Sequence, residues 1–453
     1  MRLRGIPSQK FHSERAMRFL RHSTWHHWAN LVLLAAEGLA VGIVAACVIC
    51  CFRLAKDVST PPLMDWLSQW KEHWWTAPLW LAILIAAARL LARMVRAVPL
   101  ISGSGIPQTE LVVMGRLHLS RHDWIKILPA KFFGCLISTL GGLSLGREGP
   151  CIQMGAATAS LVSGLWEHVS FSGRIHIAAG AAAGMAAAFG APVAGLCFVF
   201  EEMRSKFTWG GFIAVFFAVA GAEAVTRFAF GFGLVFPFSG ISSISLQHAW
   251  LLPVAGVIAG VAGVAYNISL LGVKNAEARF SPLPQKWRIL PQMLAGFFLA
   301  FLLPCVLGGG ENLVSSLIEE GGTGFSFLLM VFTVKILFSL VSYTGNVPGG
   351  ILMPMLCIGA LLGALCGQAF LAAGLLNVGE WEAFIVYGMA GFFASMVRAP
   401  VTGTALVIEM SGALMCLPGA AVVAFAAGLT ASAMRCPPVY DSLRAAIIVR
   451  RKK

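Results

Sequence analysis

The chain has 453 residues, of which 58% are apolar and 12% charged, and its formal net charge is +13. About a quarter of the residues in soluble proteins are charged, and no water-soluble core could bury this much apolar surface. The composition therefore excludes a soluble protein and predicts an all-α polytopic membrane protein. The basic excess lies at the chain ends and in short loops, which is typical of cytoplasmic loops beside anionic lipid and argues against a nucleic-acid partner.

Apolar runs dominate the chain after a basic segment at 1–28, which lacks a cleavable apolar stretch and is expected in the cytoplasm. Several runs are shorter than the about 20 residues that a spanning helix needs. Short runs broken by glycine or proline predict helices that stop inside the membrane, as they do at transport sites. The runs are 29–53, 77–99, 128–145, 151–165, 176–200, 207–231, 250–272, 290–308, 325–343, 351–375, 381–397 and 400–434.

Basic residues gather in five places, which we expect in the cytoplasm together with both termini. The segment 65–75 is rich in tryptophan and has fewer basic residues, so it is expected outside the cell or at the outer membrane–water interface. The five places are the N-terminal segment, residues 116–126, Arg204 with Lys206, the loop 274–288, and the tail that ends in VRRKK.

An internal repeat relates the two halves of the chain. Residues 180–201 and 388–409 are identical at nine of 22 aligned positions, among them APV and a final glutamate. Two halves with broken helices predict a site at their interface, near the middle of the membrane. The expected organisation is a first membrane repeat at 29–231, a linker at 232–249, a second repeat at 250–435, and a cytoplasmic-side helix at 436–453.

The motif GREGP at 146–150 places a carboxylate, Glu148, between apolar runs. A charge in the bilayer costs roughly 2.5–3.5 kcal/mol on insertion scales, so Glu148 must face protein or water. Pro150 suits the first turn of a helix, and a helix N-terminus attracts anions. Glu148 would then be a tethered anion that competes with a free one and leaves when protonated. A glutamate that only stabilises its helix, or that pairs with Arg147, explains the motif equally well.

Two further segments combine glycine with proline. In GSGIP at 103–107, Ser104 can donate a hydrogen bond to an anion or simply cap a helix. In GGILMP at 349–354, the backbone N–H groups of Ile351 and Leu352 can point at a ligand. Three such breaks in one membrane protein favour a ligand site over three unrelated turns.

Two polar residues near the expected cytoplasmic side are also candidates. Glu202, in FEEMR, could take up protons from the cell interior, although a surface ion pair with Arg204 is favoured from the local sequence alone. Tyr440, in CPPVYDS, is one of four tyrosines, and a lone tyrosine there usually anchors at the membrane interface.

Metal, cofactor and enzyme chemistry have little support in the sequence. Nearly all of the eleven cysteines lie inside apolar runs, the ten histidines have no metal-ligand spacing, and no nucleotide-binding motif is present. We therefore expect no metal, no cofactor and no enzymatic activity. A membrane enzyme that uses Glu148 and Glu202 as an acid pair is supported by nothing except these two carboxylates.

GSGIP, GREGP, GGIxxP and the EEM glutamates, in this order, resemble the CLC family of chloride channels and chloride/proton antiporters. KFFG at 131–134 is similar to the bacterial exchangers of that family, and the resemblance runs from about 100 to 442. It implies two inverted-topology repeats of tilted and partial helices, in a homodimer with one pore per subunit. The expected location is the bacterial inner membrane, and the chain has no room after Tyr440 for regulatory nucleotide-binding domains.

The resemblance also implies the residue roles. Glu148 would be the external gate and proton carrier, and Glu202 the internal proton glutamate, which favours exchange of chloride for protons. A passive chloride-selective channel of the same fold is the alternative function, because Leu352 replaces the phenylalanine that is usual in the family. Gln108 replaces a glutamate that is common after GSGIP. The anion would be bound by the hydroxyls of Ser104 and Tyr440 and by backbone amides of Ile351, Leu352, Arg147 and Gly149.

Overall fold

The computed structural model describes residues 10–452 apart from 69–73, 165–172, 204–207, 239, 280–282 and 320–323. The basic side chains expected in the cytoplasm up to residue 27, at Arg204 and Lys206, and from 449 onward lie outside the described part, as does most of the segment 65–75. The described residues form α-helices, short 3-10 turns and two isolated β-bridges.

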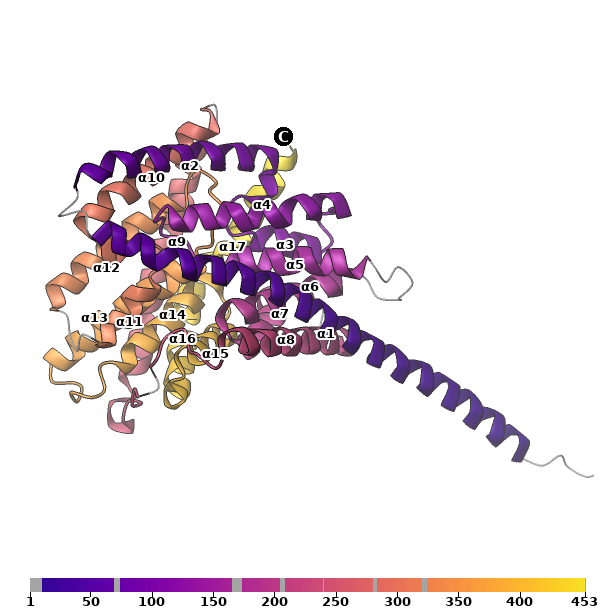
Figure 1. Ribbon diagram of the computed structural model, residues 1–453. Helices are drawn as coiled ribbons and strands as arrows, with labels where there is room; N and C mark the ends of the chain where they lie inside the picture. Colours follow the sequence, from indigo (N-terminus) through magenta and orange to yellow (C-terminus); the bar gives the residue numbers. More distant parts are fainter. Residues whose placement is uncertain are drawn as a thin grey trace, which may run out of the picture.

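The helices follow one another with short connections, and the longest, α1, crosses the molecule diagonally in Figure 1. In chain order they are α1 (Lys10–Ser68), α2 (Ala77–Ala97), α3 (Ile106–Val113), α4 (Arg121–Leu140), α5 (Glu148–Ser163), α6 (Gly173–Phe189), α7 (Pro192–Glu201), α8 (Trp209–Phe230), α9 (Leu251–Arg279), α10 (Gln285–Leu302), α11 (Glu311–Glu319), α12 (Phe325–Ser342), α13 (Leu352–Ala372), α14 (Ala383–Val397), α15 (Pro400–Ser411), α16 (Leu417–Ala433) and α17 (Val439–Lys452).

Seven of the described helices are long and apolar enough to cross a membrane, namely those in α1, α2, α8, α9, α12, α13 and α16. Others are far too short to do so, such as α3 with 8 residues and α7 with 10. The predicted mixture of full and partial helices in a multi-pass membrane protein is therefore confirmed. The core lies around α14, all of whose side chains are buried.

The two halves repeat the same packing, eight helices apart. The pairs α1–α8, α4–α5, α5–α6 and α6–α7 each have a counterpart in α9–α16, α12–α13, α13–α14 and α14–α15. Glycines allow the equivalent pairs to approach closely: a Cβ on Gly155 would lie 2.2 Å from the Gly180 carbonyl, and a Cβ on Gly359 would lie 2.7 Å from that of Gly388. The two predicted inverted repeats are confirmed.

The repeats are joined by an exchange of helix caps. Glu201, at the end of α7, accepts hydrogen bonds from the backbone N–H groups of Val401 (3.2 Å) and Thr402 (2.7 Å) at the start of α15. Glu409, in α15, accepts from the N–H groups of Val193 (3.0 Å) and Ala194 (2.8 Å) at the start of α7. Each carboxylate thus satisfies the unpaired donors of the opposite repeat. The glutamates that ended the sequence repeat are these two caps.

A buried lysine occupies the same place in each repeat. Lys131 of α4 donates to the carbonyls of Ile101 (2.9 Å) and Gly103 (2.6 Å). Lys335 of α12 donates to those of Val306 and Gly308, both at 2.8 Å. Each lysine therefore stabilises the irregular backbone that precedes a partial helix, because it donates hydrogen bonds to carbonyls that would otherwise be buried without a donor.

Two apolar runs that were each predicted as one continuous segment are divided into two helices in the structure. The run 176–200 breaks after Phe189, where Gly190 has φ +64° and Pro192 begins α7. The run 400–434 breaks at Gly412, with φ +68°, between α15 and the turn that leads to α16. Both glycines adopt the left-handed conformation that ends helices, and proline restarts the chain in a new direction.

Candidate anion and proton site

Three glycine-rich segments meet at the middle of the molecule and direct helix N-termini to one place. Gly103 pairs with Pro348 through a parallel bridge, and Gly146 pairs with Gly350 through an antiparallel one. The Gly146 N–H donates to the Gly350 carbonyl at 2.7 Å, and the Gly350 N–H returns the bond at 2.8 Å. These bridges fix the starts of α3, α5 and α13 beside one another.

The N-termini of α5 and α13 are built alike. Their N-cap residues, Arg147 and Ile351, have φ/ψ of −92°/−16° and −96°/−8°, and neither side chain caps its helix. Proline is the third helical residue in both, at Pro150 and Pro354. Each helix therefore presents N–H groups without an intrahelical partner from its N-cap residue and its first two residues, because the proline that follows has no N–H. This is the geometry of an anion site at a helix start.

Close approach at this point requires glycine. A Cβ on Gly149 would lie 2.7 Å from the Ser104 Cβ and 2.8 Å from its carbonyl oxygen. Gly105, at the start of α3, has φ +90°, and a Cβ there would lie 2.3 Å from the Gln153 side chain. The glycines of GSGIP and GREGP thus let the two segments touch.

Glu148 is the first residue of α5, and its side chain is fully buried. Neither carboxylate oxygen is hydrogen-bonded to another described residue. The Oε2 atom lies beside Gly146, whose Cβ position is also 3.0 Å from the backbone nitrogen of Met353 in α13. The carboxyl group therefore lies beside the start of α13, where the amide donors suit an anion.

The predicted hydroxyls come from two different segments, the turn before α3 and the first turn of α17. Ser104 is 1% exposed, and its Oγ accepts a bond from the Ile106 N–H at 3.3 Å, so it helps to start α3 and also lies against Gly149. Tyr440 is fully buried at the start of α17, and its hydroxyl has no hydrogen-bond partner among the described residues. The alternative of an interfacial anchor is therefore wrong for Tyr440.

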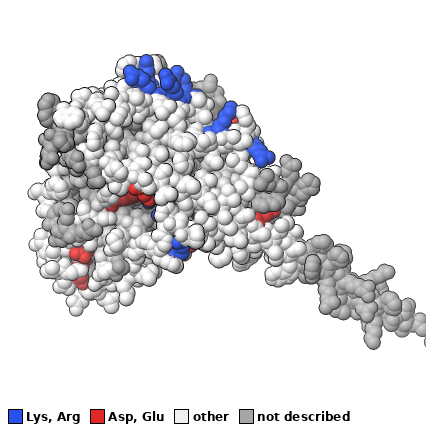
Figure 2. Space-filling view, viewed as in Figure 1, with Lys and Arg blue, Asp and Glu red and all other residues white. Residues whose placement is uncertain are grey.

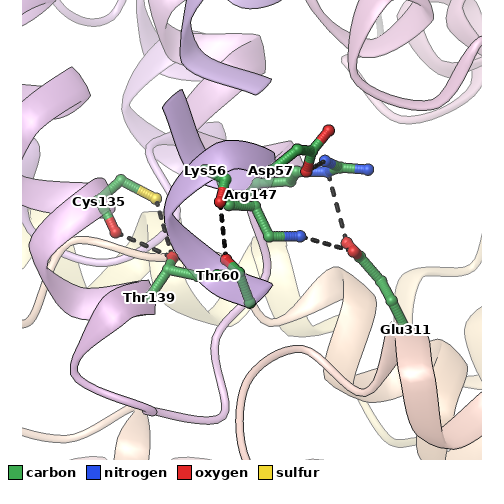
Figure 3. Close-up of polar contacts among 7 residues, drawn as sticks. All are labelled: Lys56, Asp57, Thr60, Cys135, Thr139, Arg147 and Glu311. Atoms are coloured by element: carbon green, nitrogen blue, oxygen red, sulfur yellow. Dashed lines mark hydrogen bonds and ion pairs between the residues drawn. The ribbon is translucent and has the colours of Figure 1, made fainter. Parts of the chain in front are cut away.

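Arg147 directs its guanidinium toward a cluster of charges that Figure 3 shows. Its guanidinium lies 3.5 Å from Asp57 of α1 and 3.4 Å from Glu311 of α11, and Lys56 lies 2.6 Å from the same glutamate. The alternative pairing of Arg147 with Glu148 is thus wrong, because Asp57 and Glu311 take that role. The cluster anchors the GREGP turn to two other helices.

Glu202 is 5% exposed, which is too little for the surface ion pair that the local sequence favoured. The carboxyl group of Glu110, in α3, lies near that of Glu202. Glu110 is fully buried and accepts a bond from Arg444 of α17 at 2.5 Å. Arg444 could not be recognised as the partner of Glu110 from local sequence patterns, because the two residues are 334 positions apart.

A cavity of about 470 Å³ opens beside Ser104. Gln108 lies at its wall and donates to the carbonyl of Ser102, the residue before GSGIP, at 2.9 Å. Leu352 is fully buried at the start of α13. The cavity is also lined by Lys274, Tyr343, Asn346 and Leu443.

Broken helices in two inverted repeats, with N-termini that meet at a buried point beside unpaired polar groups, define a membrane transport protein. The family model described as voltage gated chloride channel matches residues 83–432. The chain belongs to this family, the CLC family, as its motifs predicted.

Curated relatives cover nearly the whole chain. The H(+)/Cl(-) exchange transporter ClcA of Vibrio cholerae is 34% identical over 416 residues, which are 89% of this chain and 87% of that protein. The transporter of the same name from Cronobacter sakazakii is 30% identical over 468 aligned positions, covering 100% of this chain and 97% of that protein.

Solved structures show the same fold. A slow cyanobacterial Cl-/H+ antiporter superposes with a TM-score of 0.83 at 28% identity, over 93% of this chain and 99% of that one. A CLC-type fluoride/proton antiporter superposes with a TM-score of 0.68 at 23% identity, over 88% and 95% of the two chains, which shows similarity of fold.

Proposed function

We propose that this protein is a secondary-active antiporter that exchanges chloride for protons across the bacterial inner membrane. The observation that carries the proposal is the buried, unpaired carboxyl of Glu148 at the first position of α5, beside the start of α13. The relatives named H(+)/Cl(-) exchange transporter, at 30–34% identity, agree with it.

The gate follows from the electrostatics of the helix starts. When ionised, Glu148 supplies a negative charge to the N–H groups of α5 and α13 and excludes a chloride ion from the same place. When protonated, it loses this attraction, and chloride replaces it. Chloride would then be bound by N–H groups of Gly149, Ile351 and Leu352 and by the hydroxyls of Ser104 and Tyr440. Movement of one side chain thus makes proton uptake and anion entry depend on each other.

Protons and chloride would leave the site on the inner side by different routes. The cavity beside Ser104 suits the anion, because Lys274 at its wall attracts negative charge. Glu202 is buried near a second carboxyl, that of Glu110, which suits proton transfer and not anion passage, because negative charge repels anions.

The orientation rests on the basic residues. Figure 2 shows Lys and Arg side chains along the upper edge of the molecule, over α2, while most of the remaining face is neither basic nor acidic. Arg89, Arg93 and Arg96 lie in the last turns of α2, and the C-terminus lies at the same edge in Figure 1. By the positive-inside rule this edge and the C-terminus face the cytoplasm, and the basic residues of the segment 1–28 favour the same side of the membrane for the N-terminus.

A homodimer with one pore per subunit explains the short helices at the surface. The helix α7 has 10 residues and α15 has 12, yet Val193 and Val401 in their first turns are 53% and 48% exposed. Contact with lipid at these helix starts would place the capping carboxylates of Glu201 and Glu409 in hydrocarbon. A second copy of the chain against α7 and α15 would cover them, which cross-linking in native membranes can test.

The test of exchange uses liposomes that contain the purified protein and a chloride gradient, with external pH recorded and a protonophore control. Chloride moving down its gradient should drive protons uphill. Glu148→Ala and Glu202→Gln should each abolish proton movement while chloride flux persists, and Glu382→Gln, outside the site, should change neither. Chloride flux without proton movement would support a passive channel, and Leu352→Phe would then test whether the smaller side chain opens the pore.

A further inference from the structure

We propose that Glu311 is a positioning residue of the gate, which holds the Arg147 guanidinium in an ion pair and so keeps it from pairing with the Glu148 carboxylate. The inference rests on the proposed exchange function, in which Glu148 is the gate. Arg147 and Glu148 are neighbours in the chain, at the N-cap and the first position of α5. Among the described residues, however, Arg147 pairs with Asp57 and Glu311, and neither oxygen of Glu148 has a hydrogen-bond partner.

The charge cluster, which consists of Lys56, Asp57, Arg147 and Glu311, contains two positive and two negative side chains (Figure 3). The Nε atom of Arg147 lies 3.4 Å from Glu311 Oε1, and the Nζ atom of Lys56 lies 2.6 Å from Glu311 Oε2. Each oxygen of the Glu311 carboxylate thus faces one cation. The buried guanidinium is therefore compensated within the cluster, without a contribution from Glu148.

Glu311 holds Arg147 more firmly than Asp57 does. The side chain of Arg147 is 6% exposed, that of Glu311 is 24% exposed, and that of Asp57 is 46% exposed. Water and salt screen the attraction more strongly when one partner is half-exposed. Glu311 is also the first residue of α11, where the helix dipole favours a negative charge.

Loss of the Glu311 charge would leave the Arg147 guanidinium short of an acceptor. A guanidinium keeps its charge in proteins, and a buried charge without a partner is strongly unfavourable. The nearest carboxyl in the chain is that of Glu148, which is fully buried and has two free oxygens. An ion pair between the two would stabilise the ionised gate, so that protonation, and with it exchange, would require a lower pH.

The other titratable groups around the gate do not take the place of Glu311. Among the described residues, none of them forms an ion pair with Arg147 or a hydrogen bond with Glu148. Arg53 instead donates to the Ala187 carbonyl at 2.8 Å, and Lys131 and Lys335 donate to the carbonyls described above. These groups, on the elements around α5 and α11, are Arg53 on α1, Glu110 on α3, Lys131 and Cys135 on α4, Cys151 on α5, Arg174 and His176 on α6, Cys305 in the turn before α11, Lys335 on α12, Cys357 on α13 and Tyr440 on α17.

The test measures chloride and proton flux in the same liposomes over a range of pH, with equal pH on both sides. Exchange by the wild-type protein should rise as pH falls, because the gate must be protonated. Glu311→Gln should shift the midpoint of this rise by about one unit to lower pH, which is about tenfold in proton concentration. Asp57→Asn should shift the midpoint in the same direction by less. A wild-type midpoint in Glu311→Gln would overturn the inference.

Two further variants separate positioning of Arg147 from a general disturbance of the fold. Lys56→Met breaks the ion pair between α1 and α11 but leaves Glu311 beside Arg147, so the midpoint should not move to lower pH. The matched control outside the site is Glu380→Gln, since Glu380 pairs with His248 at the same distance of 2.6 Å, and it should leave the midpoint unchanged. A shift to lower pH in Lys56→Met as large as in Glu311→Gln would show that the cluster only supports the fold, and would overturn the inference.

A double variant shows whether the effect of Glu311 depends on Arg147. Arg147→Met with Glu311→Gln removes one charge of each sign, so the cluster stays balanced by Lys56 and Asp57. Its midpoint should equal that of Arg147→Met alone, because no guanidinium is left to pair with Glu148. A further shift to lower pH, as large as Glu311→Gln causes in the wild-type background, would mean direct repulsion between the two carboxylates and would overturn the inference.

The two fluxes keep this inference distinct from the proposed exchange function. Chloride flux without proton movement in the wild-type protein would overturn the exchange function. The midpoint of the chloride flux would then still test the inference, since it requires only that Glu148 and chloride compete. Coupled proton movement with a wild-type midpoint in Glu311→Gln would overturn the inference alone.

Discussion

The exchanged caps between the repeats should contribute measurable stability. Glu409→Ala removes two hydrogen bonds from N–H groups of α7 to a carboxylate, and Glu201→Ala removes two from α15 and a third from the Thr402 hydroxyl at 2.7 Å. Bonds to charged groups contribute about 1.5–3 kcal/mol each when buried, and single caps contribute about 1 kcal/mol. Because these helix starts are half-exposed, we expect about 2–3 kcal/mol for Glu409 and about 3–4 kcal/mol for Glu201.

The assay is thermal unfolding in detergent, followed by tryptophan fluorescence. Unfolding entropies of about 2 cal/mol/K per residue give this chain roughly 1 °C for each kcal/mol, so the expected falls in Tm are roughly 2–3 °C and 3–4 °C. The control is Glu382→Ala, because Glu382 is the N-cap residue of α14 but makes no cap hydrogen bond. Falls no larger than that of the control, or a larger fall for Glu409→Ala than for Glu201→Ala, would refute the capping argument.

Three further outcomes follow from the contacts. Replacing either buried lysine, in Lys131→Met or Lys335→Met, should lower the free energy of unfolding by about 2–4 kcal/mol, because two carbonyls lose their donor. Only Lys131→Met should also weaken chloride binding in calorimetry, since its partner Gly103 adjoins Ser104. Equal effects of the two variants on chloride affinity would contradict this. Gly149→Ala should abolish chloride binding, since its Cβ would meet Ser104 at 2.7 Å, whereas Gly173→Ala, with open space around it, should bind normally. Burial alone would raise the pKa of Glu380, in the loop before α14, but hydrogen bonds from the backbone of Ser245 and Asn377 outweigh it and lower that pKa to about 2. The ionised Glu380 carboxylate stabilises the fold fully above its ordinary pKa, about 4.5, and this stabilisation is lost as pH falls toward 2. Glu380→Gln should therefore lower Tm at pH 7 and reduce the fall in Tm between pH 5 and pH 3. An unchanged dependence of Tm on pH in the variant would contradict this.

Local patterns in the sequence were sufficient for the class of fold and for much of the site. Glycine and proline in GSGIP, GREGP and GGILMP mark backbone that must turn and approach closely, so they located the starts of α3, α5 and α13. The repeat of APV with its glutamate located two equivalent partial helices. These features are visible because each depends on neighbours in the chain.

Contacts between distant segments could not be predicted in this way. The sequence favoured a surface ion pair for Glu202 and an interfacial anchor for Tyr440, yet both are buried, because burial depends on how distant helices pack. Glu311 and Arg444 were not recognised as partners of Arg147 and Glu110, since the residues of each ion pair are more than 160 positions apart. The sequence showed Glu201 and Glu409 only as equivalent positions of the internal repeat, without indicating that each caps a helix of the other half.

Chloride binding as a function of pH tests most directly the central claim, that the Glu148 carboxylate and chloride exclude each other. Calorimetry on the purified protein should show wild-type affinity rising as pH falls, because protonation removes the competing charge. Glu148→Ala should bind chloride about tenfold more tightly at pH 7.5, which is ~1.4 kcal/mol, and should lose most of the pH dependence. A variant that binds chloride with wild-type affinity and wild-type pH dependence would contradict the account.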